Sequence, residues 1–275
     1  MSRDLLIKSS PHDKVGPTRA FTTRLQKGGA WLDDMRVLVR EWDDRVLTEA
    51  NEHELAGRVL GKRTRSRASD TYRRAFLPRF IEGDPPKAWK LVRTLEDREV
   101  ALEIIRPVYY WITARSDKLL YDFVTQELFA ASRRHDPHVR INEVARWITS
   151  RLEAQNQRWT PTVTLKVARG LLAALRDFGI LEGTAKKRIS PVYLPVEAFA
   201  YIAFCLHELG ASGEALVSHR DWRLFLMSPA VSERLFIEAS QRRLLQFEAA
   251  GKIYRVEFPA STVEEYSDVV ARRQF

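Results

Sequence analysis

The chain has very little cysteine and no long apolar segment, and each absence excludes a class of protein. Its one cysteine, Cys205, cannot form an internal disulfide or a cysteine-rich zinc module. The longest uninterrupted apolar run, from Ala198 to Leu206, is nine residues, whereas a membrane-spanning helix needs about 20. Residues 1–16 lack an apolar core of signal-peptide length. We therefore expect a cytoplasmic protein with no membrane partner.

Sequence motifs for catalysis and cofactor binding are also lacking. The segment 57–64 (GRVLGKRT) departs from a phosphate-binding loop, because its glycine spacing is too short and arginine follows its lysine. The His-Glu pair at 53–54 begins like a zinc-protease helix, but Gly57 occupies the place of the second histidine. We therefore expect no enzyme, with no catalytic residues, no metal and no cofactor.

The overall composition is that of a globular protein with a moderate excess of positive charge. Hydrophobic residues make up 45% of the 275 positions, and 45 Lys and Arg residues face 36 Asp and Glu residues, a net charge of +9. This length corresponds to one or two domains at about 100–200 residues each.

Apolar residues recur at helical spacing along most of the chain after Trp31. Several predicted helices begin where a capping residue precedes proline, as at Asp84-Pro85, Thr160-Pro161 and Ser228-Pro229. The predicted helices are 31–42, 46–60, 66–81, 85–95, 97–114, 117–132, 141–154, 161–178, 196–209, 214–227 and 229–241.

Strand patterns are short and few. A basic turn at 183–188 leads into a strand-like stretch that Pro191 interrupts, and a hairpin with arms 245–248 and 253–258 is predicted as the last ordered element. The fold class that follows is mainly α: a helical bundle with winged helix-turn-helix elements and one or two small β-hairpins. We expect a loose leader over 1–19, a helical domain with a first helix-turn-helix-like element over 20–114, and winged-helix-like structure over 115–275 that ends in the hairpin.

Two stretches hold the excess of positive charge. Residues 58–79 and residues 133–190 each carry a net charge of +7, so the remainder of the chain is slightly acidic. Such segregation is typical of a nucleic-acid footprint. A solvated basic helix face is the alternative explanation for either stretch.

The predicted helix 161–178 has an apolar stripe that includes Leu165, Leu172 and Leu175, and a basic stripe opposite it. As a third helix followed by a basic turn and a short strand, it fits a winged helix-turn-helix, in which this helix enters the major groove and the wing touches phosphates. The predicted DNA-binding residues of this unit are Thr162, Lys166, Arg169, Arg176, Lys186, Lys187 and Arg188. Those of the first stretch are Lys62, Arg63, Arg65, Arg67, Arg73 and Arg74.

The order of these features resembles the BrxA family of bacteriophage-exclusion (BREX) loci over about residues 20–270. The residues that carry the resemblance are Phe21-Thr22, Lys27-Gly28-Gly29, the helix 31–42, Leu60 with Lys62-Arg63-Thr64 and Arg67, Tyr109-Tyr110, the helix 119–124, Trp159-Thr160-Pro161 with Lys166, Arg169 and 175–181, the segment 221–226, the hairpin 251–259 and Glu264-Glu265-Tyr266.

The resemblance implies a helical DNA-binding protein that acts beside a site-specific DNA methyltransferase, an alkaline-phosphatase-like protein and an ATPase to mark self DNA and to block phage. The family supplies no established catalytic residues. Some members are labelled inner-membrane proteins, against which the nine-residue apolar maximum argues. This chain is longer than compact members at its leader.

The function predicted from the sequence is therefore that of a non-enzymatic component of a defence system, which binds double-stranded DNA through basic helix-turn-helix elements and helps to position the defence complex. The alternatives are a scaffold or adaptor that binds other defence subunits, an RNA-binding module, and an uncharacterised nuclease. The sequence does not indicate the DNA site, the oligomeric state or the subunits contacted.

Overall fold

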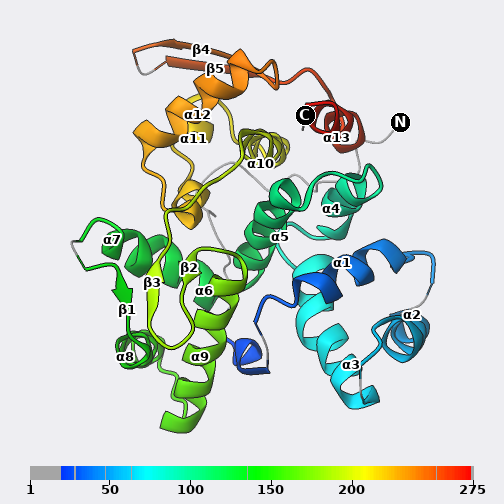
Figure 1. Cartoon of the computed structure of the whole chain (residues 1–275), viewed down its shortest axis with the longest axis vertical. Coiled ribbons are helices and arrows are strands. Elements are labelled where there is room, and N and C mark those ends of the chain that lie inside the picture. The colour runs from blue at the N-terminus through cyan, green and yellow to red at the C-terminus, as the bar shows by residue number, and fades with distance from the viewer. Residues whose placement is uncertain are drawn as a thin grey trace.

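The structure is a computed structural model that describes residues 20–27, 29–46, 48–62, 64–134, 136–251 and 253–273. The predicted leader, 1–19, and Arg63 lie outside the described residues. The chain is mainly helical, with two small antiparallel sheets (Figure 1), which confirms the predicted mainly α class with small hairpins.

The N-terminal part of the chain forms a group of short helices around an aromatic row. Trp42, Tyr72, Phe76 and Phe80 are all buried, and the Phe76 ring lies 5.5–5.9 Å from each of the other three. Pro78 lies inside a π-helical stretch, so the helix continues past it instead of ending. The elements are η1 (Arg24–Lys27), α1 (Leu32–Glu41), α2 (Thr48–Glu54), η2 (Leu55–Val59), α3 (Arg65–Thr71) and η3 (Tyr72–Ile81).

The centre of the molecule is α5 (Leu102–Ser116), which packs against α4 (Trp89–Glu96) and α10 (Val196–Glu208). Every residue of α5 from Val108 to Ser116 is buried, and α10 is buried from Val196 to Leu206. The apolar run noted in the sequence is therefore a core helix, which has neighbours on all sides.

A compact unit follows α5 in the chain. Its three-stranded antiparallel sheet has the order β1-β3-β2, in which His138 pairs with Arg188 and Leu181 pairs with Ile189. In chain order, strand β1 comes before the last two helices of the unit, α8 and α9, and strands β2 and β3 come after them. The elements are α6 (Lys118–Asp122), η4 (Phe123–Leu128), α7 (Phe129–Ala131), β1 (His138–Val139), α8 (Ile141–Glu153), α9 (Pro161–Asp177), β2 (Leu181–Glu182) and β3 (Lys187–Ile189).

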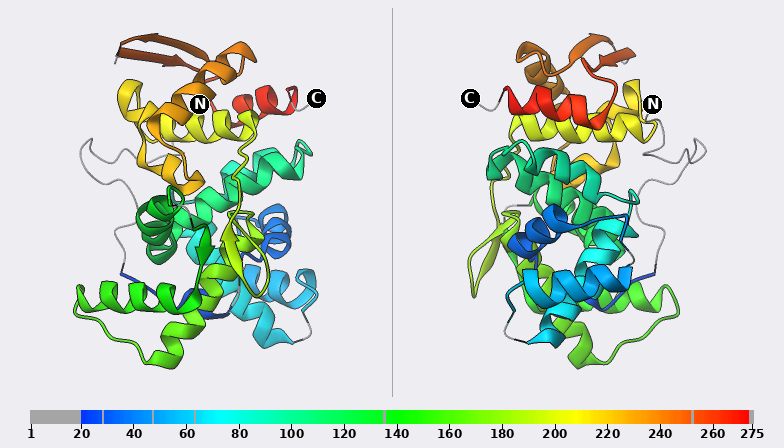
Figure 2. Two further views of the ribbon diagram at one scale, coloured as in Figure 1. Left: turned by 60° about the vertical axis from the view of Figure 1, so that its left-hand side comes forward. Right: turned by 90° about the vertical axis from the view of Figure 1, so that its right-hand side faces the viewer.

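The C-terminal part contains a second set of helices followed by a hairpin at one end of the molecule (Figures 1 and 2). Phe247 and Tyr254 lie on the hairpin face that packs toward α12, where Phe247 stacks on Phe236. The elements are α10, α11 (Gly213–Val217), η5 (Arg220–Phe225), α12 (Pro229–Gln241), β4 (Gln246–Ala250), β5 (Ile253–Glu257) and α13 (Val263–Ala271).

Three sequence predictions were wrong in detail. The helix predicted from Asp84-Pro85 begins only at Trp89, because the Asp84 carboxylate pairs with Arg115 and does not cap it. The single helix predicted over 214–227 is broken into α11 and η5. The hairpin is not the last ordered element, since α13 follows it and packs against α4 and α10.

Candidate nucleic-acid interface

Helix α9 presents an apolar side to the core and a basic side to solvent. The Thr160 hydroxyl accepts from the Val163 backbone N–H at the start of the helix, and Gly179 follows its end with φ of 82°. Of the stripe predicted to face the core, Leu172 and Leu175 are buried and Leu165 is half-buried. The predicted basic stripe is exposed as a whole: Thr162, Lys166, Arg169 and Arg176.

The cations of α9 differ in their partners. Arg176 pairs with the adjacent Asp177 at 2.8 Å, which neutralises much of its charge. Lys166 and Arg169 form no ion pair with any carboxylate in the described part of the chain. These two side chains therefore carry the available positive charge of the helix.

The turn between β2 and β3 brings a second set of cations next to α9. Gly183 has φ of 86°, and a Cβ there would lie 2.1 Å from the Lys186 carbonyl oxygen, so the turn requires glycine. Lys186 is exposed, whereas Lys187 Nζ donates to the Thr184 carbonyl and Arg188 pairs with Glu182 across the strands. Lys186 is thus the least restrained cation of the turn.

A groove of about 710 Å³ separates this turn from α9. Its lining residues include four cations and one histidine, together with apolar side chains and no carboxylate. The residues that line it are His138, Val139, Arg140, Ile141, Arg169, Leu172, Ala185, Lys186 and Lys187. A groove of this kind suits a polyanion whose backbone carries both charge and apolar sugar surface.

Arg140 is a groove residue that was not among the predicted contacts. Its guanidinium pairs with Asp136 at 3.1 Å and with Glu143 at 3.3 Å. Backbone and side-chain hydrogen bonds from His138, with the help of Arg140, lower the pKa of the Asp136 carboxyl to about 2. Only the pairing of β1 with β3 brings Arg140 to the turn, and a two-residue strand leaves no signal in the sequence.

In the N-terminal stretch, ion pairs occupy half of the predicted cations. Lys62 pairs with Asp34 at 2.6 Å, Arg73 with Glu52 at 2.8 Å, and Arg74 with Asp70 at 2.7 Å. Arg65 and Arg67, in the first turn of α3, are exposed and form no ion pair within the described residues. The net charge of +7 in this stretch therefore overstates the charge that a ligand can use.

Arg79, which contributes to the same charge excess, has a structural position. It is buried, its guanidinium donates to the backbone carbonyls of Gly29 and Ala30, and it lies 5.9 Å from the Trp31 ring. The Ala30 N–H in turn donates to the Asp177 carboxylate at the end of α9. This chain of contacts ties the N-terminal helices to α9.

Helix α9 and η1 approach each other closely at Gly170, where a Cβ would lie 1.7 Å from the Leu25 carbonyl oxygen of η1. The absence of a side chain at this position lets η1 lie along the flank of α9. The basic stripe of α9 stays free, because Lys166 and Arg169 are exposed beside this contact.

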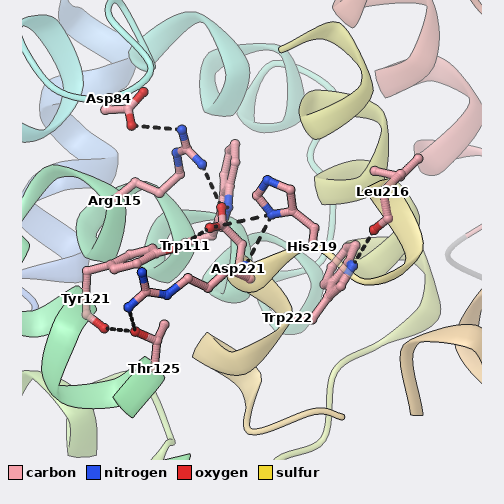
Figure 3. Close-up of polar contacts among 10 residues, drawn as sticks. Asp84, Trp111, Arg115, Tyr121, Thr125, Leu216, His219, Asp221 and Trp222 are labelled. Atoms are coloured by element: carbon pink, nitrogen blue, oxygen red, sulfur yellow. Dashed lines mark hydrogen bonds and ion pairs between the residues drawn. The ribbon is translucent and has the colours of Figure 1, made fainter. Parts of the chain in front are cut away.

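A second cluster of titratable groups surrounds Asp221 at the centre of the molecule (Figure 3). Its carboxylate, fully buried, accepts from Trp111 Nε1 at 2.7 Å, from Arg115 Nη1 at 2.8 Å and from Tyr121 Oη at 2.7 Å. Arg115 also donates to Asp84 at 2.8 Å. The cluster joins α5, α6 and η5.

Burial would raise the pKa of the Asp221 carboxyl, but the Arg115 guanidinium outweighs it and lowers the pKa to about 2. Desolvation by burial lowers the pKa of His219, which lies beside Asp221. Both oxygens of this carboxylate accept hydrogen bonds from the protein, Oδ2 from Trp111 and Arg115 and Oδ1 from Tyr121. We therefore assign the cluster to the core and not to a substrate site.

Comparison with known protein families identifies the family of this chain. A model of the BrxA family matches residues 19–204, which is more than half of the chain. The chain belongs to the BrxA family. The resemblance noted in the sequence is thereby confirmed, and membership of BrxA implies a component of a BREX phage-defence system. No protein of curated function matches the chain.

Solved structures share the fold of this BrxA protein at low sequence identity. An uncharacterized protein from Magnetospirillum magneticum has a TM-score of 0.56 and 14% identity, and the match covers 75% of this chain and 98% of that one. SspB, in a magnesium-ion-bound crystal structure, has a TM-score of 0.57 and 12% identity, with 94% and 88% covered. A second SspB structure matches at 11% identity over the same shares. These likenesses show the fold alone.

Two further findings bear on the sequence predictions. Among the described residues, no helix is both long enough and apolar enough to cross a bilayer. The same residues contain no group of three or more His, Cys, Asp or Glu side chains placed to hold a metal ion.

Proposed function

We propose that this BrxA protein is a non-enzymatic BREX component that binds duplex DNA through α9 and the β2–β3 turn. The observation that carries the proposal is the basic groove between them, whose lining residues include Arg169, Lys186 and Lys187 and no carboxylate. The exposed, unpaired Lys166 extends this positive surface along α9. Phosphate contacts of this kind supply most of the affinity of a protein for duplex DNA.

We further propose that residues 118–189 form a winged helix-turn-helix. The order of elements supports it: a helical segment, one strand, α8 and α9, then a two-stranded hairpin whose second strand pairs with the first strand. In this arrangement α9 is the recognition helix and the β2–β3 turn is the wing. Thr162, Lys166 and Arg169 then face base edges, while Lys186 contacts a phosphate.

The N-terminal helices supply a second contact to the same DNA in this proposal. Helices α3 and α9 both begin at the end of the molecule that is opposite to the β4–β5 hairpin (Figures 1 and 2). Arg65 and Arg67, in the first turn of α3, are the cations free to act there. This gives separate roles to the parts 20–114 and 115–275, with the complex assembling on DNA in the cytoplasm.

The test compares duplex DNA, single-stranded DNA and duplex RNA as ligands of the parent protein and of Lys166→Ala/Arg169→Ala. We expect preference for duplex DNA and at least tenfold weaker binding by the variant, because one base-edge contact is worth about 1–3 kcal/mol. The matched control is Arg272→Ala/Arg273→Ala, two exposed cations after α13, which should bind as the parent does.

The other outcomes identify the alternatives. No duplex binding at low salt would contradict the proposal and favour a scaffold that contacts other BREX subunits, and preference for RNA would favour an RNA-binding module. If Arg65→Ala/Arg67→Ala loses binding while Lys166→Ala/Arg169→Ala keeps it, α9 is not the recognition helix.

We propose separately that the protein catalyses no reaction on DNA. The magnesium-bound state belongs to SspB, and the described residues of this chain contain no group of three or more His, Cys, Asp or Glu side chains placed to hold a metal ion. Purified protein should therefore leave supercoiled DNA intact in magnesium or manganese. Cleavage that disappears when one of its own carboxylates is replaced would contradict this.

A further inference from the structure

A pocket of about 370 Å³ lies where the unit 118–189 meets the C-terminal helices. One wall is the end of α7 with Pro137, another is the segment that leaves β3, and the third is the turn from η5 into α12. Nine of its twelve lining residues have apolar side chains, among them Ile189, Val192, Phe225, Met227 and Val231, while polar atoms make up about half of its exposed surface. The pocket therefore offers a binding place to an apolar side chain.

Two arginines come from the segments that form two walls of this pocket, although neither lines it. Arg133 follows α7, and its guanidinium carbon lies 4.4 Å from the centroid of the Phe129 ring. Arg223 belongs to η5, and its guanidinium carbon lies 5.0 Å from the centroid of the same ring. The ring thus holds two like charges close together, although they come from segments about 90 positions apart in the sequence.

The charge of this arginine pair (Arg133 and Arg223) is available to a ligand. Both side chains belong to exposed residues, and neither forms an ion pair with a carboxylate in the ranges that the structure describes. Arg134, which lines the pocket, pairs with Glu127 at 3.5 Å in an exposed position, where such a pair is weak. Two unpaired guanidiniums held near each other favour a bound anion that reduces their repulsion.

We propose that the pocket and the arginine pair form a docking site for a short acidic segment of a partner protein. A bulky apolar side chain of the segment occupies the pocket, and flanking carboxylates bind the guanidiniums of Arg133 and Arg223. Arginine suits this role because its planar guanidinium donates two parallel N–H hydrogen bonds to the two oxygens of one carboxylate. An apolar anchor surrounded by charged contacts is the usual composition of a protein–protein hot spot.

The lining of the pocket favours a protein segment over a nucleic acid. A DNA backbone places a phosphate ridge against a protein surface and has no bulky apolar group to fill an apolar hollow. The site also lies at α7, away from the end of the molecule where α3 and α9 begin (Figure 1). Docking here thus involves residues other than those proposed to hold DNA, and the two proposals succeed or fail separately.

The probes are fluorescein-labelled peptides Glu-Asp-Glu-X-Glu-Asp-Glu, in which X is Leu, Phe or Trp, and a matched peptide in which X is Ala. We expect fluorescence polarisation to show saturable binding for at least one of the three, and at least tenfold weaker binding for the Ala peptide. Arg133→Glu/Arg223→Glu should abolish binding. Val192→Glu, which adds charge to the pocket wall, should weaken it at least tenfold.

Two controls separate docking from general electrostatics. Arg272→Glu/Arg273→Glu makes the same change of net charge far from the pocket and should bind the peptides as the parent does. Val192→Glu should keep its affinity for duplex DNA, which also shows that it is folded. The proposal would be overturned if none of the peptides binds, or if the Ala peptide binds as well as the others. It would also be overturned if Arg272→Glu/Arg273→Glu loses as much peptide affinity as Arg133→Glu/Arg223→Glu. A loss of DNA affinity in Arg133→Glu/Arg223→Glu that the control lacks would overturn it too, because the pair would then belong to the DNA surface.

Discussion

The carboxylate of Asp221 is fully removed from solvent, yet it stays ionised because three donors surround it, one of them the Arg115 guanidinium. Burial of an ion costs several kcal/mol, and only well-placed opposite charge and hydrogen bonds compensate for it. Here Arg115 supplies the charge, and Trp111 and Tyr121 supply further hydrogen bonds. Removal of the acid would leave the Arg115 charge at the centre of the core with Asp84 as its remaining carboxylate partner.

Asp221→Asn should therefore lower the free energy of unfolding at pH 7 by about 3–5 kcal/mol, the usual cost of breaking a buried pair. The pKa of Asp221 is about 2 in the folded protein and near 3.9 in an unfolded chain. Because the folded value is the lower one, its stabilisation is full above pH 4 and is lost as the pH falls toward 2. Urea unfolding at pH 7 and pH 3 measures both effects.

The asparagine variant should lose less stability than the parent between these two pH values. As a control, Glu54→Gln breaks an exposed pair with Arg58 and should change stability little. If Asp221→Asn unfolds at the same urea concentration as the parent, the cluster does not stabilise the core.

At the scale of elements, the contact between η1 and α9 depends on the missing side chain at Gly170. A Cβ there would overlap the Leu25 carbonyl, and backbone atoms cannot give way as a flexible side chain can. The element that holds η1 in place is thus the same helix that we propose to enter the DNA groove.

Gly170→Ala should destabilise the protein by about 1–3 kcal/mol, the range for overpacking, and should raise amide hydrogen exchange in 24–30. Gly57→Ala is a matched control, because a Cβ there meets nothing within 4 Å; there the substitution should be neutral or stabilise by up to about 1 kcal/mol. Equal effects of the two substitutions would show that the approach at Gly170 is unimportant.

The β2–β3 turn gives a second test at this scale. Lys186→Ala should reduce the slope of log affinity for duplex DNA against log salt by about 1, since one phosphate contact is lost. Arg188→Ala should change the slope less, because Glu182 already pairs with that guanidinium. A larger effect at Arg188 than at Lys186 would mean that the ion pair opens when DNA binds.

The elements also show where sequence reasoning succeeds and where it stops. The bounds of α9 and α12 were predicted to within one residue, because a cap, a proline and a regular apolar period agree there. The segment 214–227 was predicted as one helix, but the buried position of Asp221 requires a tighter turn. The spacing of residues within this segment does not predict that Asp221 pairs with Arg115, which lies more than a hundred positions earlier.

Predictions for the site have the same limit. The stripe of α9 was predicted correctly, since one helix fixes which side chains share a face. The ion pairs of Lys62 and Arg73 were not predicted, because Asp34 and Glu52 belong to other helices. The pair of Arg74 with Asp70, four positions earlier, could have been predicted from spacing. The groove at Arg140 exists only once β1 has paired with β3.

At the scale of the whole molecule, the usable charge is smaller than the net charge of +9. The predicted contact cations that neither pair with a carboxylate nor are held by a backbone carbonyl, within the described ranges, are Arg65, Arg67, Lys166, Arg169 and Lys186. Four of these cations lie on α3 and α9, and both helices begin at the same end of the molecule. Binding should therefore be moderate in strength and sensitive to salt.

Phosphate contacts from Arg65, Arg67 and Lys186 predict a slope of about −2.7 for duplex DNA, at about −0.9 for each contact. Fluorescence anisotropy with a labelled duplex between 50 and 200 mM sodium chloride gives this number directly. The same titration of Arg65→Ala/Arg67→Ala should lower the magnitude of the slope by about 2. A slope near zero for the parent would contradict an electrostatic interface.

The cluster at Asp221 also has a consequence for how the chain is made. Asp84 and Arg115 leave the ribosome well before residue 221 does, so the guanidinium has no partner in η5 during most of synthesis. The central helix α5 therefore cannot complete its burial until nearly all of the chain has emerged. A nascent chain that stalls before η5 would present an incomplete core to chaperones and proteases, and this BrxA protein would mature late, as one piece.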